Sequence, residues 1–475
     1  MRVSENDRPH WDVIVIGGGP AASTIGSLLA RDGYSVILLE RDIHPRDHVG
    51  ESLTPSTNLI FERIGFQEKM EDAGFVHKPG AAWTSPRAPL GTFFSIRLAE
   101  FAMPGAKQPY TYNIERDEFD TLLLRHAHDQ GAKVLEGVNV QRVLFDGERA
   151  VGVRVRVVEG WEQDLFAKVV VDASGRRCLL ANQLGLRKKD PRFKQYSIYS
   201  WFRGVEPNPL GFEGVAWFYF LGLERAWAWS LPLRDGKSSI GVVTTKEDFQ
   251  KSGRTHEEFF ASLVNLNRSF RYVMRGAERI RPWWIEADYS YKVDTLHGPG
   301  WLLIGDALRF VDPIFSTGVD IAMFSAAFAH QAIAAVLTGD DDEERAFKGY
   351  ESHVSDGIET WYRLIDLFYT HPHMLSRYAA SLQHREDVIR TLQGNLYLAE
   401  SLERAQRVIG TMELAHHLVM ADPDNLLRPG AIEPALNGPD ELPTGSDDGW
   451  RLGYTGPAEV VVRDAEGVSS SRSEN

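Results

Sequence analysis

The stretch Val13–Ala22, with the sequence VIVIGGGPAA, decides the fold of this chain. Its apolar run Val13–Ile16 is typical of a buried strand, and the glycines that follow end this strand before a segment that favours a helix. Gly17 permits a tight turn, Gly19 lets backbone N–H groups approach a pyrophosphate, and Ala22 takes the small position where helix packs on strand. The pattern predicts a strand, a turn and a helix whose N-terminus binds a dinucleotide.

A second apolar run supports this interpretation. It covers Tyr34–Leu39 and ends at Glu40. An acidic side chain at that distance from the glycines suits the ribose hydroxyls of a dinucleotide. A glycine-rich turn alone is a weak signal, but here the strand before it, the helix after it and the acid all agree.

Composition excludes several classes of protein. The formal net charge of the 475 residues is −14 at pH 7, which does not favour a nucleic-acid partner. Cys178 is the one cysteine, so an internal disulfide is impossible, and we expect a small buried thiol in a cytoplasmic protein. Met1–Pro9 has no apolar region typical of a signal peptide. Ile321–Leu337 is short and contains polar residues, so we expect a buried helix and no membrane span.

Three motifs together resemble the flavoprotein monooxygenase superfamily. They are the glycine turn with Glu40, the segment Asp172–Gly175 (DASG) at a strand end, and Gly305–Ala307 (GDA) followed by Asp312-Pro313. The resemblance implies that the cofactor is FAD and that Asp306 holds its ribityl or ribose hydroxyls. It implies FAD contacts at these residues: Gly17, Gly19, Ala21, Ala22, Glu40, Arg41, Ser52, Arg116, Asp306, Pro313, Gly318 and Val319.

Within that superfamily the chain resembles the flavin-dependent halogenases. Trp227–Pro232 (WAWSLP) is similar to the halogenase motif Trp-x-Trp-x-Ile-Pro, with Leu231 in place of isoleucine. Two tryptophans two residues apart on a strand can also simply share a face of the core. The resemblance implies that Trp227 and Trp229 shield the flavin from the organic substrate.

Lys78 is the second halogenase feature. It lies between aromatic and apolar residues, next to Pro79, and follows the Gly50–Ser52 segment at the spacing that the family shows for its active-site lysine. Most lysines are solvated surface charges. A catalytic lysine suits this chemistry because its amine holds an electrophilic halogen and its pKa moves readily on burial.

The segment Asp312–Gly318 is the third feature. In the family, backbone N–H groups of a Thr-Gly pair bind the halide, which here implies Thr317 and Gly318. Halogenases that act on free tryptophan carry a glutamate where this chain has Phe315. The chain therefore resembles the branch that halogenates phenols and pyrroles, often tethered to an acyl or peptidyl carrier protein.

The organisation predicted is α/β. We expect a core at 1–345, a helical region at 346–421 and a loop-rich tail at 422–475 with a disordered end at Gly467–Asn475. In the core, a Rossmann-type FAD-binding domain is interleaved with a large, mostly antiparallel substrate-side sheet. The FAD-binding parts are about 11–75, 114–185 and 290–345, and the sheet spans about 78–113 and 190–290.

The resemblance implies a mechanism. Reduced FAD, supplied by a separate flavin reductase, reacts with oxygen to a flavin hydroperoxide, chloride or bromide attacks it, and hypohalous acid reaches Lys78 before an electron-rich ring is substituted. The pathway would be one of secondary metabolism, such as antibiotic biosynthesis. A deprotonated phenol would be more reactive, and His77, Asp320 and Glu51 are the candidate bases, but the sequence selects none of them and each is typical of a structural or surface residue. Histidine pairs such as His371/His373 lack the cysteine or carboxylate cluster of a metal site, so we expect no metal.

Two alternatives stay open from the sequence. An aromatic hydroxylase of the same fold would share every flavin motif but would not require Lys78 or the tryptophan pair. A non-catalytic flavoprotein would bind a partner through its C-terminal helices. The product distinguishes these alternatives from a halogenase: a halogenase adds a halogen, a hydroxylase adds one oxygen, and a non-catalytic flavoprotein yields no modified product.

Overall fold

The computed structural model describes residues 10–425, except 87, 92, 158–159, 210 and 288, together with 428, 459–463 and 469–473. Its chain divides into two compact units, each assembled from three segments. The first unit comprises Met1–Ala73, Glu115–Pro191 and Ser290–Glu359, and the second comprises Gly74–Ile114, Arg192–Tyr289 and Thr360–Asn475. This alternation confirms the interleaved α/β architecture expected from the sequence.

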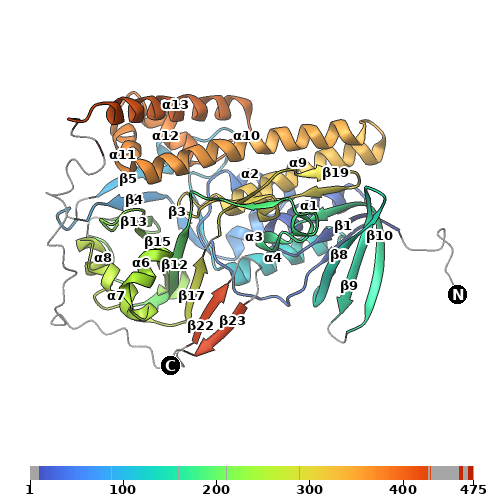
Figure 1. Ribbon diagram of the computed structural model, residues 1–475, viewed down its shortest axis with the longest axis horizontal. Helices are drawn as coiled ribbons and strands as arrows, with labels where there is room; N and C mark the ends of the chain where they lie inside the picture. Colours follow the sequence, from blue (N-terminus) through green and yellow to red (C-terminus); the bar gives the residue numbers. More distant parts are fainter. Residues whose placement is uncertain are drawn as a thin grey trace. The chain divides into compact units, whose positions relative to one another are not determined.

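The first unit is built on an eight-stranded sheet with the order β19-β20-β10-β1-β2-β7, extended by β9 and β8. Strands β8, β9 and β10 of this sheet can be followed in Figure 1. Strand β1 pairs in parallel with both β2 and β10, because the run around Val13–Ile16 is fully apolar and is buried on both faces. The strands are β1 (His10–Ile16), β2 (Val36–Leu39), β7 (Lys133–Leu135), β8 (Val138–Asp146), β9 (Arg149–Val157), β10 (Glu162–Asp172), β19 (His297–Gly298) and β20 (Trp301–Leu303).

Helices and a smaller sheet complete this unit. Helix α1 packs extensively against α9 and α4. The helices are α1 (Pro20–Arg31), α2 (Thr57–Ile64), α3 (Gln67–Asp72), α4 (Arg116–Asp129), α5 (Leu179–Gln183) and α9 (Gly318–Thr338), with short 3-10 turns η3 (Gly175–Arg177) and η5 (Gly305–Ala307). A three-stranded sheet consists of β11 (Arg187–Lys189), β18 (Tyr291–Val293) and β21 (Arg309–Phe310).

Helix α9 differs from one expectation. By length and composition alone it could cross a membrane, whereas we expected no segment able to do so. Alanine and larger apolar residues make up most of this helix, and Asp320 is its one charged residue, so its mean hydropathy is high. However, 61% of its most apolar window is buried inside the protein, as is typical of a core helix. The expected buried helix is therefore confirmed.

The second unit is built on a ten-stranded, mostly antiparallel sheet. The tryptophan-containing strand β14 lies between β13 and β15. The strands are β4 (Gly80–Thr84), β5 (Phe94–Arg97), β12 (Gln195–Arg203), β13 (Ala216–Phe220), β14 (Trp227–Pro232), β15 (Ser238–Thr245), β16 (Glu278–Arg279), β17 (Trp283–Ala287), β22 (Glu459–Arg463) and β23 (Ser469–Ser473), and a separate ladder joins β3 (Val76–Lys78) to β6 (Thr111–Asn113).

Helices pack around this sheet (Figure 1). An apolar core of sheet residues and of α7 and α8 side chains fills the space between them. The helices of the unit are α6 (Lys246–Ser252), α7 (His256–Val264), α8 (Arg268–Val273), α11 (Pro372–Ala380), α12 (Arg385–Leu392) and α13 (Ala399–Ala421), with the turns η2 (Leu98–Glu100) and η4 (Arg234–Gly236). Helix α10 (Glu343–Thr370) begins in the first unit and ends in the second.

Part of the tail differs from expectation. We expected disorder over Gly467–Asn475, but Ser469–Ser473 forms β23, which pairs antiparallel with β22. Strand β22 in turn pairs in parallel with β17. The run of three valines in the sequence of β22 favours an extended backbone. Most of the remaining tail lies outside the described residues.

Candidate active site

The carboxyl ends of four strands are level with one another in the first unit. The register pairs Ile16 with both Leu39 and Asp172, and Asp172 with Leu303. The residues that follow are the glycine turn after β1, Glu40 after β2, the DASG segment after β10 and Asp306 after β20. The sheet thus brings together motifs that are nearly 300 residues apart, at the edge where open α/β sheets bind ligands.

The glycine turn requires glycine for two separate reasons. Gly17 has a φ of +114°, and a Cβ atom there would lie 2.5 Å from the backbone oxygen of Ala173. At Gly18 a Cβ atom would lie 2.9 Å from the Cβ atom of Glu40. At Gly19 the nearest atom to a Cβ is the guanidinium nitrogen of Arg46, at 3.6 Å. The first two glycines therefore serve internal packing, whereas the space at Gly19 suits the approach of a ligand.

Helix α1 begins directly after this turn. Gly19 is its N-cap, and no side chain caps the helix. The N–H groups of its first turn have no intrahelical partners, and the helix dipole makes this end partially positive. Ala22 is fully buried, as the packing role predicted for it requires. These features fit the pyrophosphate of FAD.

Glu40 has a role that the sequence did not reveal. Its Oε2 atom accepts a hydrogen bond from the Gly18 N–H group at 2.6 Å, and its Oε1 atom accepts one from Asp42 N–H at 2.9 Å. The side chain therefore holds the glycine turn in place. Its contact with a ribose stays a prediction, as does that of Arg41, whose Nε atom lies 3.5 Å from the Asp42 carboxylate.

Arg116 forms a buried ion pair at the start of α4. Its Nε and Nη2 atoms donate to the two carboxylate oxygens of Asp120, at 2.7 and 3.0 Å. Although burial opposes ionisation, the charge of Arg116 holds the pKa of Asp120 below its ordinary value. The remaining Nη1 atom donates to the Val49 carbonyl at 2.5 Å. Arg116 thus fastens the loop that leads to the buried Ser52, in addition to its predicted contact with FAD.

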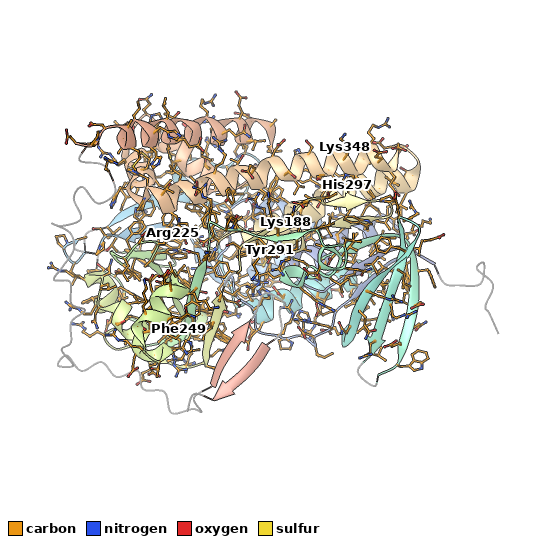
Figure 2. All side chains as sticks on the ribbon, viewed as in Figure 1. Lys188, Arg225, Phe249, Tyr291, His297 and Lys348 are labelled. Atoms are coloured by element: carbon orange, nitrogen blue, oxygen red, sulfur yellow. The ribbon has the colours of Figure 1, made fainter. Side chains whose placement is uncertain are left out.

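Asp306 lies in η5, beyond the end of β20, with a half-buried side chain. Burial raises the pKa of its carboxyl group to about 6, against the opposing charges of Arg176 and Arg116. The Tyr291 hydroxyl (Figure 2) donates to the backbone oxygen of Asp306 at 2.5 Å, which holds the turn. A carboxylate on a half-buried residue whose backbone is held in this way fits the ribityl or ribose hydroxyls of FAD.

The segment before α9 forms a tight turn into the helix. Asp312 accepts the Ile314 N–H at 3.0 Å, and Ser316 N–H donates to the Pro313 carbonyl at 3.0 Å. Thr317 is the N-cap of α9, its side chain caps no N–H group, and it is buried. The predicted halide contact therefore coincides with the partially positive end of a 21-residue helix. The same turn includes the predicted FAD contacts Gly318 and Val319.

Asp320 also lies in the first turn of α9, and it is fully buried. Its Oδ1 atom accepts hydrogen bonds from Ser56, at a very short distance, and from Thr54 at 3.2 Å. Burial raises the pKa of the carboxyl group to about 7, although both hydroxyls oppose this. Among the three candidate bases, Asp320 forms hydrogen bonds that join α9 to the segment after Glu51. His77 is exposed, and its ring stacks on the ring of Tyr110.

Lys78 lies in the second unit at the end of β3. Its side chain is only 7% exposed, and burial lowers its pKa from 10.5 to about 7. The ladder places Lys78 directly opposite Thr111 and places Val76 opposite Asn113. Sequence reasoning missed Thr111 and Asn113, both completely buried, because a three-residue strand has too few positions for a periodic pattern.

Trp227 and Trp229 are buried in the same sheet, with ring centroids 5.8 Å apart. The Trp227 indole donates to the Tyr369 hydroxyl at 2.8 Å, and the Trp229 indole donates to Ser239 at 3.1 Å. A Cβ atom at Gly241 would lie 2.2 Å from the Trp229 ring. Both rings are therefore held rigidly. Their predicted flavin-shielding role requires such fixed orientation.

Two further expectations concern metals and the thiol. Among the described residues, no group of three or more histidine, cysteine or acidic side chains could hold a metal ion. The Nδ1 atoms of His371 and His416 are 3.3 Å apart, with no third ligand in the described part of the chain. Cys178 is buried, and burial raises the pKa of its thiol to about 12, as an inert structural thiol requires.

Comparisons with known proteins identify the family of the chain. A family model described as an FAD binding domain matches residues 10–358. The chain is 37% identical over 433 residues to a 1H-pyrrole-2-carbonyl-[peptidyl-carrier protein] chlorinase of Pseudomonas fluorescens, covering 88% of this chain and 95% of that protein. It is 31% identical to the corresponding brominase of Pseudoalteromonas luteoviolacea, covering 81% and 92%. The solved structure of the flavin-dependent brominase Bmp2 aligns with a TM-score of 0.77 at 29% identity, covering 86% of this chain and 100% of that one.

Proposed function

The chain belongs to the FAD-binding flavin-dependent halogenases, and from that premise we propose that it chlorinates a pyrrole ring held as a 2-carbonyl group on a peptidyl carrier protein. Two relatives named for this substrate, a chlorinase and a brominase, support the proposal. Chloride is the preferred halide in this proposal because the chlorinase has the higher identity. Phenols and free tryptophan are the competing substrates, and Phe315 argues against free tryptophan.

The observation that carries the proposal is the buried Lys78. With a pKa of about 7, its amine is half unprotonated at neutral pH and is available as a nucleophile. A surface lysine would be almost entirely protonated under these conditions. An aromatic hydroxylase has no use for such an amine.

The two units contribute different residues to the proposed reaction. In the first unit we assign FAD to the glycine turn, Arg116 and Asp306, and the halide to Thr317 and Gly318. When bound, FAD supplies the oxygen chemistry that oxidises the halide to hypohalous acid. The uncapped N-terminus of α9 favours an anion there through its backbone N–H groups.

Lys78 performs the halogen transfer. The neutral amine attacks the halogen of the hypohalous acid, an N–halogen bond forms, the halogen–oxygen bond breaks, and water leaves. The ring carbon then takes the halogen and gives up its proton, which restores the amine. Trp227 and Trp229 keep the flavin from the organic substrate, so oxygen transfer to the ring does not compete. A separate flavin reductase supplies reduced FAD, and a cytoplasmic location is part of the same proposal.

Mass spectrometry tests this function. The enzyme is incubated aerobically with FAD, a flavin reductase, NADH, chloride and a panel consisting of pyrrole-2-carbonyl carrier protein, free pyrrole-2-carboxylate, phenols and tryptophan. We expect the chlorine isotope pattern on the carrier-bound pyrrole alone. A product heavier by one oxygen would make the protein a hydroxylase, and chlorination of a free phenol or tryptophan would overturn the substrate assignment.

The matched variant is Lys78→Met, which removes the amine and keeps a side chain of similar length. We expect it to bind FAD and to oxidise chloride, so that hypohalous acid escapes and chlorinates a scavenger added to the solution. Full chlorination of the pyrrole by this variant would refute the role of Lys78.

A further inference from the structure

Lys78 shares one face of its ladder with two buried polar side chains. In an antiparallel pair, directly opposite residues project to the same face, and so do residues two positions apart along one strand. Lys78 lies opposite Thr111, and Asn113 follows two residues later opposite Val76. Thr111 and Asn113 both have exposed fractions of 0%. A lysine, a hydroxyl and a carboxamide therefore project from the same buried face.

In the carboxamide of Asn113, the nitrogen has a hydrogen-bond partner among the described residues and the oxygen has none. Its Nδ2 atom donates to the Gly214 carbonyl at 3.1 Å. Its Oδ1 atom is buried and accepts no hydrogen bond from any described residue. A buried acceptor without a donor is costly, so each such atom in a folded protein requires an explanation. No described residue provides that donor, so a bound ligand is one source of it.

The orientation of this carboxamide is fixed by the strand that carries Lys78. Gly214 has a φ of +76°, and a Cβ atom there would lie 2.0 Å from the backbone oxygen of His77. The Gly214 backbone is thus pressed against β3, one residue from Lys78. Because Asn113 donates to Gly214, its amide nitrogen is directed to this contact. Rotating the carboxamide so that its oxygen and nitrogen exchange places would break the hydrogen bond from Asn113 to Gly214.

We propose that Asn113 is a specificity-determining residue whose Oδ1 atom accepts a hydrogen bond from the ring N–H group of the substrate. This inference rests on the proposed function and deepens it. The N–H group of a pyrrole ring is a hydrogen-bond donor. It therefore complements an amide oxygen that has no donor among the described residues. Diagonal neighbours in such a ladder are about 7–8 Å apart, so a single five-membered ring reaches Asn113 with its nitrogen and Lys78 with a carbon.

The chemistry also benefits from this hydrogen bond. Electrophilic substitution develops positive charge on the ring, much of it on the pyrrole nitrogen. A hydrogen bond from that nitrogen to an amide oxygen strengthens as the charge grows, so it stabilises the transition state more than the bound substrate. Asn113 therefore orients the ring and favours its reaction with the halogen on Lys78.

The test compares two carrier-bound ligands, one with a ring N–H donor and one without it. Peptidyl carrier protein is loaded with pyrrole-2-carbonyl or with furan-2-carbonyl, which has the same ring size but no N–H group. Their dissociation constants for the FAD-loaded enzyme are measured without reductant, so ring reactivity does not contribute. We expect the pyrrole to bind about 10- to 100-fold more tightly, as for a hydrogen bond whose loss leaves a buried acceptor unpaired. Equal affinities in the wild-type enzyme would overturn the inference without any variant.

The variant Asn113→Leu then tests whether Asn113 causes the tighter binding of the pyrrole ligand. This variant keeps the number and branching of the side-chain heavy atoms but has no acceptor, and we expect its affinities for the two ligands to agree within about threefold. Gln195→Met is the matched control, because Gln195 is also a buried amide and lies on β12. Its Nε2 atom donates to the backbone carbonyl of Arg225 at 3.5 Å, and its Oε1 atom has no partner in the described chain. The control should keep the wild-type preference. A preference that persists in Asn113→Leu, or that Gln195→Met also loses, would refute the assignment.

The two proposals fail in different ways. If the wild-type enzyme does not chlorinate carrier-bound pyrrole, the proposed function is wrong. If it chlorinates this substrate but binds the pyrrole and furan ligands equally, the function stands and the role of Asn113 is wrong.

Discussion

Replacing Lys78 with methionine should stabilise the protein at neutral pH, even though it removes the proposed catalytic amine. Lys78 is buried, and its pKa falls from 10.5 to about 7 for that reason. The folded state must therefore release a proton that the unfolded chain retains, and this release costs free energy. Methionine has no proton to release and fills a similar space with apolar atoms.

The magnitude follows from the two pKa values. Each pKa unit corresponds to about 1.4 kcal/mol, so the cost of folding with a neutral Lys78 is about 4 kcal/mol at pH 7 and about 2 kcal/mol at pH 9. Between the folded pKa and the unfolded pKa the unfolded chain binds more protons, so the stability of the wild-type protein rises with pH. The advantage of Lys78→Met should accordingly shrink by about 2 kcal/mol between pH 7 and pH 9.

Urea unfolding of the FAD-loaded proteins, followed by tryptophan fluorescence at the two pH values, measures this difference. Lys348→Met is the control, because Lys348 is exposed (Figure 2) and its replacement removes the same charge from the surface. Its effect on stability should not differ between the two pH values. A gap in unfolding free energy between wild type and Lys78→Met that is unchanged from pH 7 to pH 9 would refute the conclusion that burial lowers the pKa of Lys78 to about 7.

Three further perturbations test other parts of the molecule. Gly17→Ala places a Cβ atom 2.5 Å from the Ala173 oxygen at a φ of +114°, so the variant should lose FAD, as measured by flavin absorbance after gel filtration; full retention would contradict the packing described. Asp320→Asn should gain stability over the wild type by about 2 kcal/mol as pH rises from 5.5 to 8, because the raised carboxyl pKa of about 7 makes ionisation costly in the folded state; parallel stability curves against pH would refute this. Tyr369→Phe leaves the buried Trp227 indole without its acceptor and should cost about 1–3 kcal/mol in chemical unfolding, whereas an unchanged unfolding midpoint would show that the bond contributes nothing.

Local patterns in the sequence predicted the parts of the fold that depend on neighbours along the chain. The run Val13–Ile16, the glycines and the helix after them form β1, the turn and α1 as expected, because a parallel central strand must be apolar on both faces. The break before Pro372 likewise separates α10 from α11, since proline cannot continue a helix.

Contacts between distant residues were beyond sequence reasoning. Asp320 bonds to Ser56 across 264 positions, and Trp227 bonds to Tyr369 across 142. Asn113 lies in a strand of three residues, where alternation cannot be recognised. Glu40 was expected at a ribose, but its bond to Gly18 depends on the register between β1 and β2, which no local pattern determines.

The alternation of the two units along the chain has a consequence for how the protein is made. The FAD-binding sheet requires β20, which lies beside β10, and its unit continues to Glu359. A ribosome must therefore synthesise two segments of the second unit before the first unit can close, and the nascent chain leaves and re-enters the first unit in the meantime. No single proteolytic or genetic cut releases either unit as a continuous fragment. Efforts to exchange substrate specificity between such enzymes must consequently graft several separate segments at once, and successful recombination should be confined to crossovers that respect all five junctions between the units.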